Sequence, residues 1–288
     1  MNLDEALELH KAGKLEEAKC LYQALLLTED NPDIIYFLGL LEMQSGQYQQ
    51  AIDALLTALE RQPNASKIHV ALGKAFVQIG ELAVAEEHFF TATEIDPSAN
   101  HLFLLGTVQY QLEDKESAQR CWTMALQCDP NHFEALLFLG SLQDENNQEE
   151  EALRLWSIAF EVNPDSLQIR DVLSRWYSRA AEKHFDTDPK QSLSLINTAL
   201  EYSSNAKLLH QKSEILLQLQ QMEAALTHCE SALELEQEAV FYHTLGNIYR
   251  LSNQPQRALQ SYRQAKEMGL EHPATNQAIE QLQNILDQ

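Results

Sequence analysis

The chain has 288 residues and carries 20 Lys plus Arg against 43 Asp plus Glu, a net charge of −23 at pH 7. Because affinity for nucleic acid and anionic lipid comes largely from basic side chains, this charge argues against DNA, RNA and anionic membranes as general partners. No apolar run approaches the roughly 18 residues of a spanning helix, and the acidic start is unlike a signal peptide. We therefore expect a cytoplasmic protein without membrane insertion.

Small residues recur along the chain at a nearly constant interval of about 34 residues, which indicates a repeat array. Gly39, Gly73, Gly106 and Gly140 form one such series, and two series of alanines and one of prolines keep the same spacing. Within each unit, apolar residues recur at three- and four-residue steps, a polar turn such as 45–47 interrupts them, and a proline follows. The pattern predicts two amphipathic helices per unit.

A helical hairpin of about 34 residues cannot bury its own apolar stripe, so it has to stack on its neighbours in an open solenoid. We count eight such units over residues 1–272 and interpret the apolar stripe of residues 273–288 as a C-terminal capping helix. The predicted units are 1–31, 32–65, 66–98, 99–132, 133–166, 167–205, 206–237 and 238–272.

The sixth unit departs from this pattern. Ser174 replaces the repeat Gly and Ser192 the repeat Ala, and these two serines lie farther apart in the sequence than Gly39 and Ala51 do. Six extra residues, within about 174–191, must lengthen the first helix or its turn. We expect Asp188 and Pro189 to begin the second helix as N-cap and first position.

These residues resemble the tetratricopeptide repeat family. Its aromatic-x-x-Leu-Gly-x-x-Tyr stretch appears most fully as Tyr242, Leu245, Gly246 and Tyr249. Its Ala-x-x-x-aromatic stretch appears, for example, as Ala118 with Trp122. The resemblance implies an all-α, right-handed superhelical solenoid of about eight helix-turn-helix repeats, with the first helix of each lining the inner surface, and a function in binding other proteins.

Residues typical of catalysis or of cofactor binding are not grouped in the sequence. The repeat accounts for all nine glycines, so none remains for a phosphate-binding loop, and neither HExxH nor a Cys/His cluster with metal-ligand spacing occurs. His228 beside Cys229 is the nearest metal candidate, but neighbouring helical residues point about 100° apart. We expect no enzyme activity, no cofactor and no metal, and we interpret the four cysteines as buried residues in a reducing compartment.

The predicted groove follows from the repeat register. Residues three before, one after and four after the repeat Gly share one helical face. In the first five units this face is largely apolar and aromatic, although residues 1–166 hold 9 basic and 28 acidic side chains. The predicted peptide-binding residues are Tyr36, Leu40, Met43, Val70, Lys74, Val77, Phe103, Thr107, Tyr110 and Leu137.

Packing is the alternative role for each of these residues, because inner helices of neighbouring units also touch. The family's clamp on chaperone tails needs Lys and Asn beside the repeat Gly of its first unit, where this chain has Leu3 and Leu7. The clamp is therefore disfavoured.

The sequence predicts a scaffold or adaptor whose first five units bind an apolar and basic peptide segment of a protein partner. One alternative is a regulatory or targeting subunit of an enzyme of the glycosyltransferase or methyltransferase type. Another is a structural rod in an assembly. No residue pattern indicates the oligomeric state.

Overall fold

A computed structural model describes residues 2–287, which form seventeen α-helices and contain no strand. The prediction of an all-α repeat fold is confirmed. The helices are α1 (Leu3–Lys11), α2 (Leu15–Leu26), α3 (Pro32–Gln44), α4 (Tyr48–Arg61), α5 (Ser66–Gln78), α6 (Leu82–Ile95), α7 (Ala99–Gln111), α8 (Lys115–Cys128), α9 (Phe133–Glu145), α10 (Glu149–Val162), α11 (Leu167–His184), α12 (Pro189–Tyr202), α13 (Ala206–Gln218), α14 (Met222–Leu235), α15 (Ala239–Leu251), α16 (Pro255–Glu267) and α17 (Pro273–Leu286).

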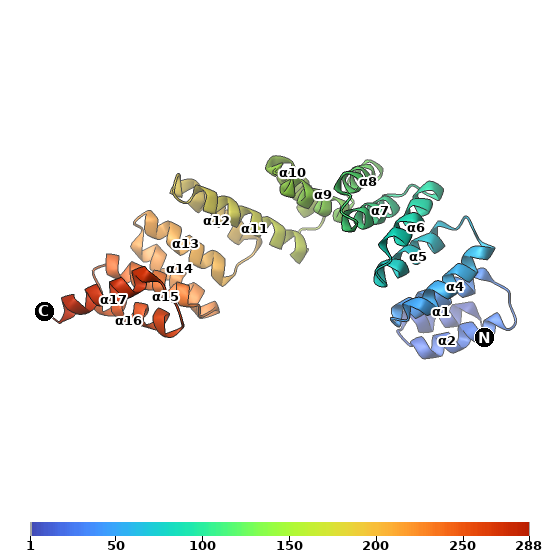
Figure 1. Ribbon diagram of the computed structural model, residues 1–288, viewed down its shortest axis with the longest axis horizontal. Coiled ribbons are helices and arrows are strands. Elements are labelled where there is room, and N and C mark those ends of the chain that lie inside the picture. Colours follow the sequence, from blue (N-terminus) through green and yellow to red (C-terminus); the bar gives the residue numbers. More distant parts are fainter. Residues whose placement is uncertain (1, 288) are drawn as a thin grey trace. The chain divides into compact units, whose positions relative to one another are not determined.

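The helices divide into two compact units, Met1–Asn163 with α1 to α10 and Pro164–Gln288 with α11 to α17. Within each unit, consecutive helices pair as antiparallel hairpins that follow one another along the chain (Figure 1). The repeat register carries no sign of the boundary after Asn163, which falls three residues before the end of the predicted fifth repeat. Each unit is built from contacts between neighbouring helices, as expected for a repeat array.

Close packing inside each hairpin explains the repeated Gly. A Cβ atom added at Gly73 would lie 2.7 Å from Phe89, and one added at Gly140 would lie 2.5 Å from the indole nitrogen of Trp156. Phe89 and Trp156 are 1% and 3% exposed, respectively, so in these hairpins the second helix packs a large side chain directly on the backbone of the first. The same arrangement holds at Gly246.

The cysteines only partly follow the sequence prediction. Cys229 is buried in the slot that Phe89 and Trp156 occupy in other hairpins, and burial raises the pKa of its thiol to about 12. Cys20 and Cys128 are exposed, so the prediction of burial is wrong for them. Both lie on second helices, at positions that the periodic apolar stripe does not include.

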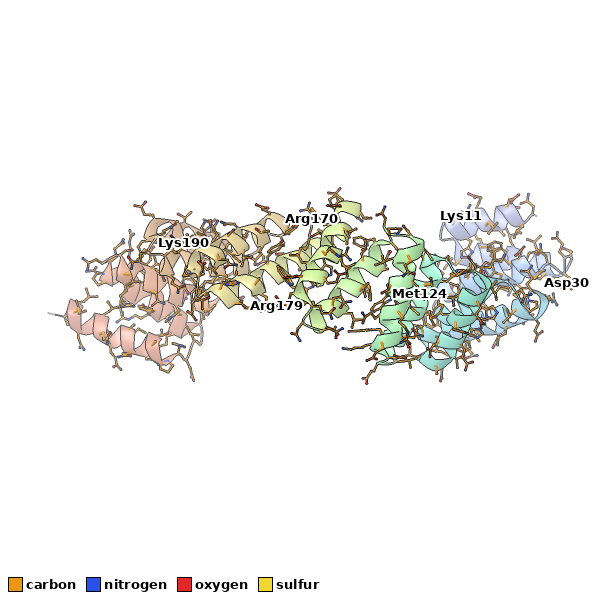
Figure 2. The ribbon with its side chains drawn as sticks, turned by 90° about the horizontal axis from the view of Figure 1, so that it is seen from above. Lys11, Asp30, Met124, Arg170, Arg179 and Lys190 are labelled. Atoms are coloured by element: carbon orange, nitrogen blue, oxygen red, sulfur yellow. The ribbon has the colours of Figure 1, made fainter. Side chains whose placement is uncertain are left out.

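The extra residues of the sixth hairpin lengthen its first helix. Helix α11 has 18 residues where α9 has 13. Asp188 accepts a hydrogen bond from the backbone N–H of Gln191 and Pro189 is the first helical residue, which confirms the predicted start of α12. Figure 2 shows the basic side chains Arg170 and Arg179 on α11 and Lys190 on α12.

Helix α17 covers the last hairpin. Its buried residues Ile279 and Leu282 pack with Ala258, Leu259 and Tyr262 of α16. Ile285 belongs to the apolar stripe expected for residues 273–288 but is 61% exposed, whereas its neighbour Leu286 packs against this cluster. The helix has an apolar face toward α16 and polar side chains elsewhere, as a capping helix requires.

A chain that ends at residue 272 is expected to expose the α16 face and to aggregate, because Leu259 and Tyr262 lose their cover. Light scattering and the fluorescence of an added naphthalene sulfonate dye measure this change. The variant Ile285→Gln is the matched control, since it alters only an exposed side chain of α17. A truncated chain that stays monodisperse and binds no dye would contradict the cap assignment.

Candidate functional site

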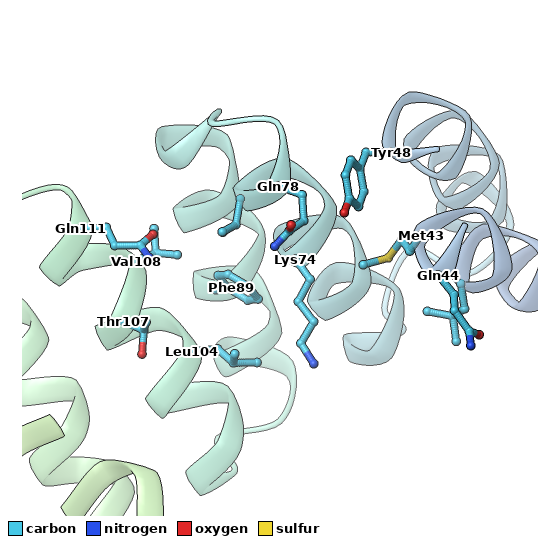
Figure 3. Close-up of a pocket in the computed structure, with 12 residues that line it drawn as sticks. Met43, Gln44, Tyr48, Lys74, Gln78, Phe89, Leu104, Thr107, Val108 and Gln111 are labelled. Atoms are coloured by element: carbon cyan, nitrogen blue, oxygen red, sulfur yellow. The ribbon is translucent and has the colours of Figure 1, made fainter. Parts of the chain in front are cut away.

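A cavity of about 480 Å³ opens in the first compact unit, residues 1–163. It lies on three successive inner helices, α3, α5 and α7, and also contacts α4 and α6. Figure 3 shows Val108 and Gln111 on one side of it, Met43 and Tyr48 on the other, and Phe89 and Lys74 between them. The cavity is lined by Leu40, Met43, Gln44, Tyr48, Lys74, Val77, Gln78, Phe89, Leu104, Thr107, Val108 and Gln111.

Five predicted groove residues meet in this cavity: Leu40, Met43, Lys74, Val77 and Thr107. They occupy the positions one and four residues after the repeat Gly, so the stacking of α3, α5 and α7 brings the same helical face together three times. Leu40, Met43 and Val77 are each half-buried and line the cavity. The repeat register thus predicted a set of residues that share one cavity, and their role in peptide binding stays a prediction.

Tyr36 and Phe103 do not line the cavity, because they contact neighbouring side chains between repeats. The Tyr36 ring lies 4.9 Å from the ammonium of Lys67 in the next hairpin. The Phe103 ring lies 5.4 Å from that of Phe138 on α9. Both are three residues before the repeat Gly, a position that turns toward the following inner helix.

Tyr110, Val70 and Leu137 also lie outside the cavity. The Tyr110 hydroxyl donates a hydrogen bond of 2.7 Å to the Glu145 carboxylate, which joins α7 to α9. Val70 packs against the buried cluster around Phe89. Leu137 is 3% exposed, so the expectation that it presents a side chain in the groove is wrong: α9 is covered on that face.

Several cavity residues were not predicted from the sequence. Gln44, Gln78 and Gln111 lie five residues after the repeat Gly, each as the last residue of its helix. This series keeps the spacing of the repeat Gly, so the register did contain a signal for it. Tyr48 and Phe89 come from the second helices α4 and α6, which a search confined to inner helices cannot find.

Charge in the cavity is confined to Lys74, the one formally charged side chain among its lining residues. Its ammonium has no ion-pair partner within the described part of the chain, and the side chain is exposed. Leu40, Met43, Val77, Leu104 and Val108 surround it with apolar surface. This combination suits apolar side chains of a ligand beside a carbonyl or carboxylate oxygen.

Among residues 2–287, no cluster of three or more His, Cys, Asp or Glu side chains has the geometry to hold a metal ion. None of the described helices is both long and apolar enough to cross a bilayer.

The second unit carries a smaller and more polar cavity, of about 200 Å³, between α15, α16 and α17. His243, Asn247, Arg250 and Tyr262 line it together with residues of the capping helix. The Tyr262 hydroxyl donates a hydrogen bond of 2.8 Å to Asn247 Oδ1. The two cavities therefore differ in chemistry, and only the one in the first unit offers a continuous apolar wall.

Residues 36–100, 206–238 and 242–274 match the tetratricopeptide repeat family. The chain belongs to the tetratricopeptide repeat family. A tetratricopeptide repeat-containing protein of Pseudomonas aeruginosa is 34% identical over 122 residues, which cover 41% of this chain and 48% of that protein. Anaphase-promoting complex subunit 3 of Dictyostelium discoideum is 29% identical over 111 residues, 38% of this chain and 11% of that subunit. The matches thus span half or less of both relatives.

Solved tetratricopeptide structures share the fold at low sequence identity. The C-terminal part of a repeat protein from Cytophaga hutchinsonii superposes with a TM-score of 0.66 at 10% identity, covering 85% of this chain and 99% of that one. A repeat protein from Parabacteroides merdae gives 0.52 at 17% identity, with coverage of 88% and 98%. YrrB, described as having an unusual peptide-binding site, gives 0.51 at 18% identity, with coverage of 65% and 93%.

Proposed function

We propose that this tetratricopeptide repeat protein is a scaffold or adaptor that binds a peptide segment of a partner protein in the cavity of the first unit. The observation that carries the proposal is the cavity itself: about 480 Å³, open to solvent, walled by apolar side chains from three repeats and free of acidic lining residues. A concave apolar surface with a few polar groups is the usual form of a recognition site. The family's fold makes a protein partner the expected ligand.

The charge of residues 1–166 adds a preference to this site. Residues 1–166 carry 28 acidic and 9 basic side chains, and none of the acids lines the cavity. A peptide with apolar side chains seated in the cavity and Lys or Arg on its flanks satisfies both features. The flanking bases act mainly on the rate of encounter, whereas the apolar contacts determine how long the complex lasts.

YrrB gives a precedent for peptide binding on this fold, since its structure is described by its peptide-binding site. At 18% identity the likeness concerns the fold. The binding residues proposed for this chain therefore rest on its own cavity, and the cytoplasmic location remains a prediction.

The substitution Val77→Glu is expected to weaken peptide binding roughly tenfold, or about 1 to 2 kcal/mol, because it places a charge in the apolar wall. Random 12-residue peptides displayed on phage are selected on the full chain, and enriched peptides are synthesised with a fluorescent label. Fluorescence anisotropy then gives the Kd for both proteins. We expect the enriched peptides to carry apolar residues together with Lys or Arg.

Leu56→Glu is the matched control, because Leu56 is a 40% exposed residue of α4 in the same unit and does not line the cavity. It introduces the same charge at a distance from the wall, and affinity should change less than twofold. Equal effects of the two substitutions, with both variants folded, would show that the peptides bind elsewhere.

A role as a subunit of a larger assembly is the second candidate. It is supported by the match of 111 residues to a subunit of the anaphase-promoting complex of Dictyostelium discoideum. In that case a partner would cover a broad surface rather than insert a short segment, and no 12-residue peptide would depend on Val77. A role beside an enzyme, as a targeting or regulatory subunit, would use the same cavity and differ only in the identity of the partner.

A further inference from the structure

Three successive inner helices end on a glutamine that lines the cavity. Gln44 is the last residue of α3, Gln78 of α5 and Gln111 of α7, and all three are exposed. The inner helices on either side end differently, α1 at Lys11 and α9 at Glu145, and neither of these residues lines the cavity. The glutamine series therefore coincides with the cavity.

Two of these side chains have unused hydrogen-bonding groups. Gln44 Oε1 lies 3.0 Å from His10 Nε2, which holds that amide against α1. Among residues 2–287, no hydrogen-bond partner exists for the amides of Gln78 and Gln111. A primary amide offers donors and an acceptor, as a peptide group does, so each of these two can pair with one peptide unit of a bound chain.

Resting on the function proposed above, we propose that the bound segment is extended and that Gln78 and Gln111 hydrogen-bond two separate peptide groups of its main chain. An extended chain leaves its N–H and C=O groups available, whereas a helix uses its own internally. It advances about 3.3 Å per residue, so one short segment can pass two side chains that belong to different helices.

The side chains of such a segment have a defined place. In an extended chain they alternate between two faces, so those on the inner face reach the wall formed by Met43, Val77 and Leu104. Lys74 lies on α5, four residues before Gln78, and lines the same cavity, where its ammonium can bind a main-chain carbonyl oxygen. A helical ligand would present only side chains to this edge, and the amides of Gln78 and Gln111 would then have no part in binding.

The test uses a synthetic 12-residue peptide from the phage selection whose binding is weakened by Val77→Glu. Its residues are N-methylated one at a time, and each methylated peptide is measured against the wild-type full chain and against Gln78→Met and Gln111→Met. Methionine keeps the length of glutamine and its helix propensity but removes the amide. Gln127→Met, at an exposed position of α8 outside the cavity, is the control.

We expect Gln78→Met and Gln111→Met each to raise the Kd about three- to tenfold, the range of one neutral hydrogen bond. N-methylation at two separate positions of the peptide should have a similar effect, and each position should lose its effect in one of the two variants. Gln127→Met should leave the Kd unchanged.

Two outcomes overturn the inference in distinguishable ways. The extended main-chain mode is wrong if Val77→Glu raises the Kd of a peptide but Gln78→Met and Gln111→Met leave it unchanged. It is also wrong if the bound peptide shows the chemical shifts of a helix. In both cases the proposed function stands. If the selection yields no peptide that depends on Val77, the proposed function fails, and the inference fails with it.

Discussion

Replacement of Gly106 by Leu is expected to lower the free energy of unfolding by about 1 to 3 kcal/mol, because the hairpin of α7 and α8 has no space for a side chain there. A Cβ atom at Gly106 would lie 2.7 Å from the indole nitrogen of Trp122 and 3.1 Å from the backbone oxygen of Ala118. The indole donates a hydrogen bond of 3.3 Å to the backbone oxygen of Phe103, so Trp122 cannot move away without losing it. Urea unfolding followed by circular dichroism measures the loss.

Ala83→Leu serves as the control for this substitution, since Ala83 is exposed on α6 and the added side chain meets solvent. Its unfolding midpoint should stay close to that of the wild type. A Gly106→Leu chain that unfolds at the wild-type urea concentration would show that α7 and α8 do not cross at this residue.

The sequence could predict the fold because one spacing constrains many residues at once. Gly73 and Phe89, for example, recur as Gly140 and Trp156, and each pair marks the crossing of a hairpin. The longer α11 was visible in the same way, from the wide separation of Ser174 and Ser192. The boundary at Asn163 left no such trace, because a periodic sequence shows which residues are equivalent but not how tightly two successive repeats pack.

The candidate site was predictable only in part, for a related reason. Helical periodicity gives the direction of a side chain from its own axis, and this identified Leu40, Met43 and Val77 as cavity residues. It does not tell whether the next helix covers that side chain, so Leu137 was placed in the groove although it is buried. Nor does it include contributions from the second helices, such as that of Tyr48.

We expect a buried histidine of the second compact unit to make the protein sensitive to acid. His210 on α13 is 8% exposed, stacks on Phe241 with ring centroids 4.5 Å apart, and its Nε2 lies 2.8 Å from the Thr244 hydroxyl. Burial, with a smaller contribution from nearby His243, lowers the pKa of His210 to about 4. Although Glu214 Oε1 lies 3.7 Å from the ring, burial raises the pKa of that carboxyl, so the pair is not a full ion pair.

The sign of the pH dependence follows from this pKa. In the unfolded chain His210 takes up a proton near its ordinary pKa of 6.5, whereas in the folded chain it stays neutral down to about pH 4. Its contribution to stability is therefore complete above pH 6.5 and is lost as the pH falls from 6.5 to 4. Glu214 acts in the opposite direction, because its raised pKa makes the folded chain bind a proton before the unfolded chain does.

His210→Gln is expected to remove this acid sensitivity while its amide keeps a hydrogen bond to Thr244. Between pH 7.5 and pH 5, the wild type should lose about 2 kcal/mol more unfolding free energy than the variant, since each pKa unit corresponds to about 1.4 kcal/mol. Urea unfolding at a series of pH values gives both curves. His101→Gln is the comparison, because His101 lies in the first unit, beside Asp96. If wild type and His210→Gln lose stability in parallel as the pH falls, the pKa of His210 is the same in the folded and unfolded chains, and its burial is not the cause of the acid sensitivity.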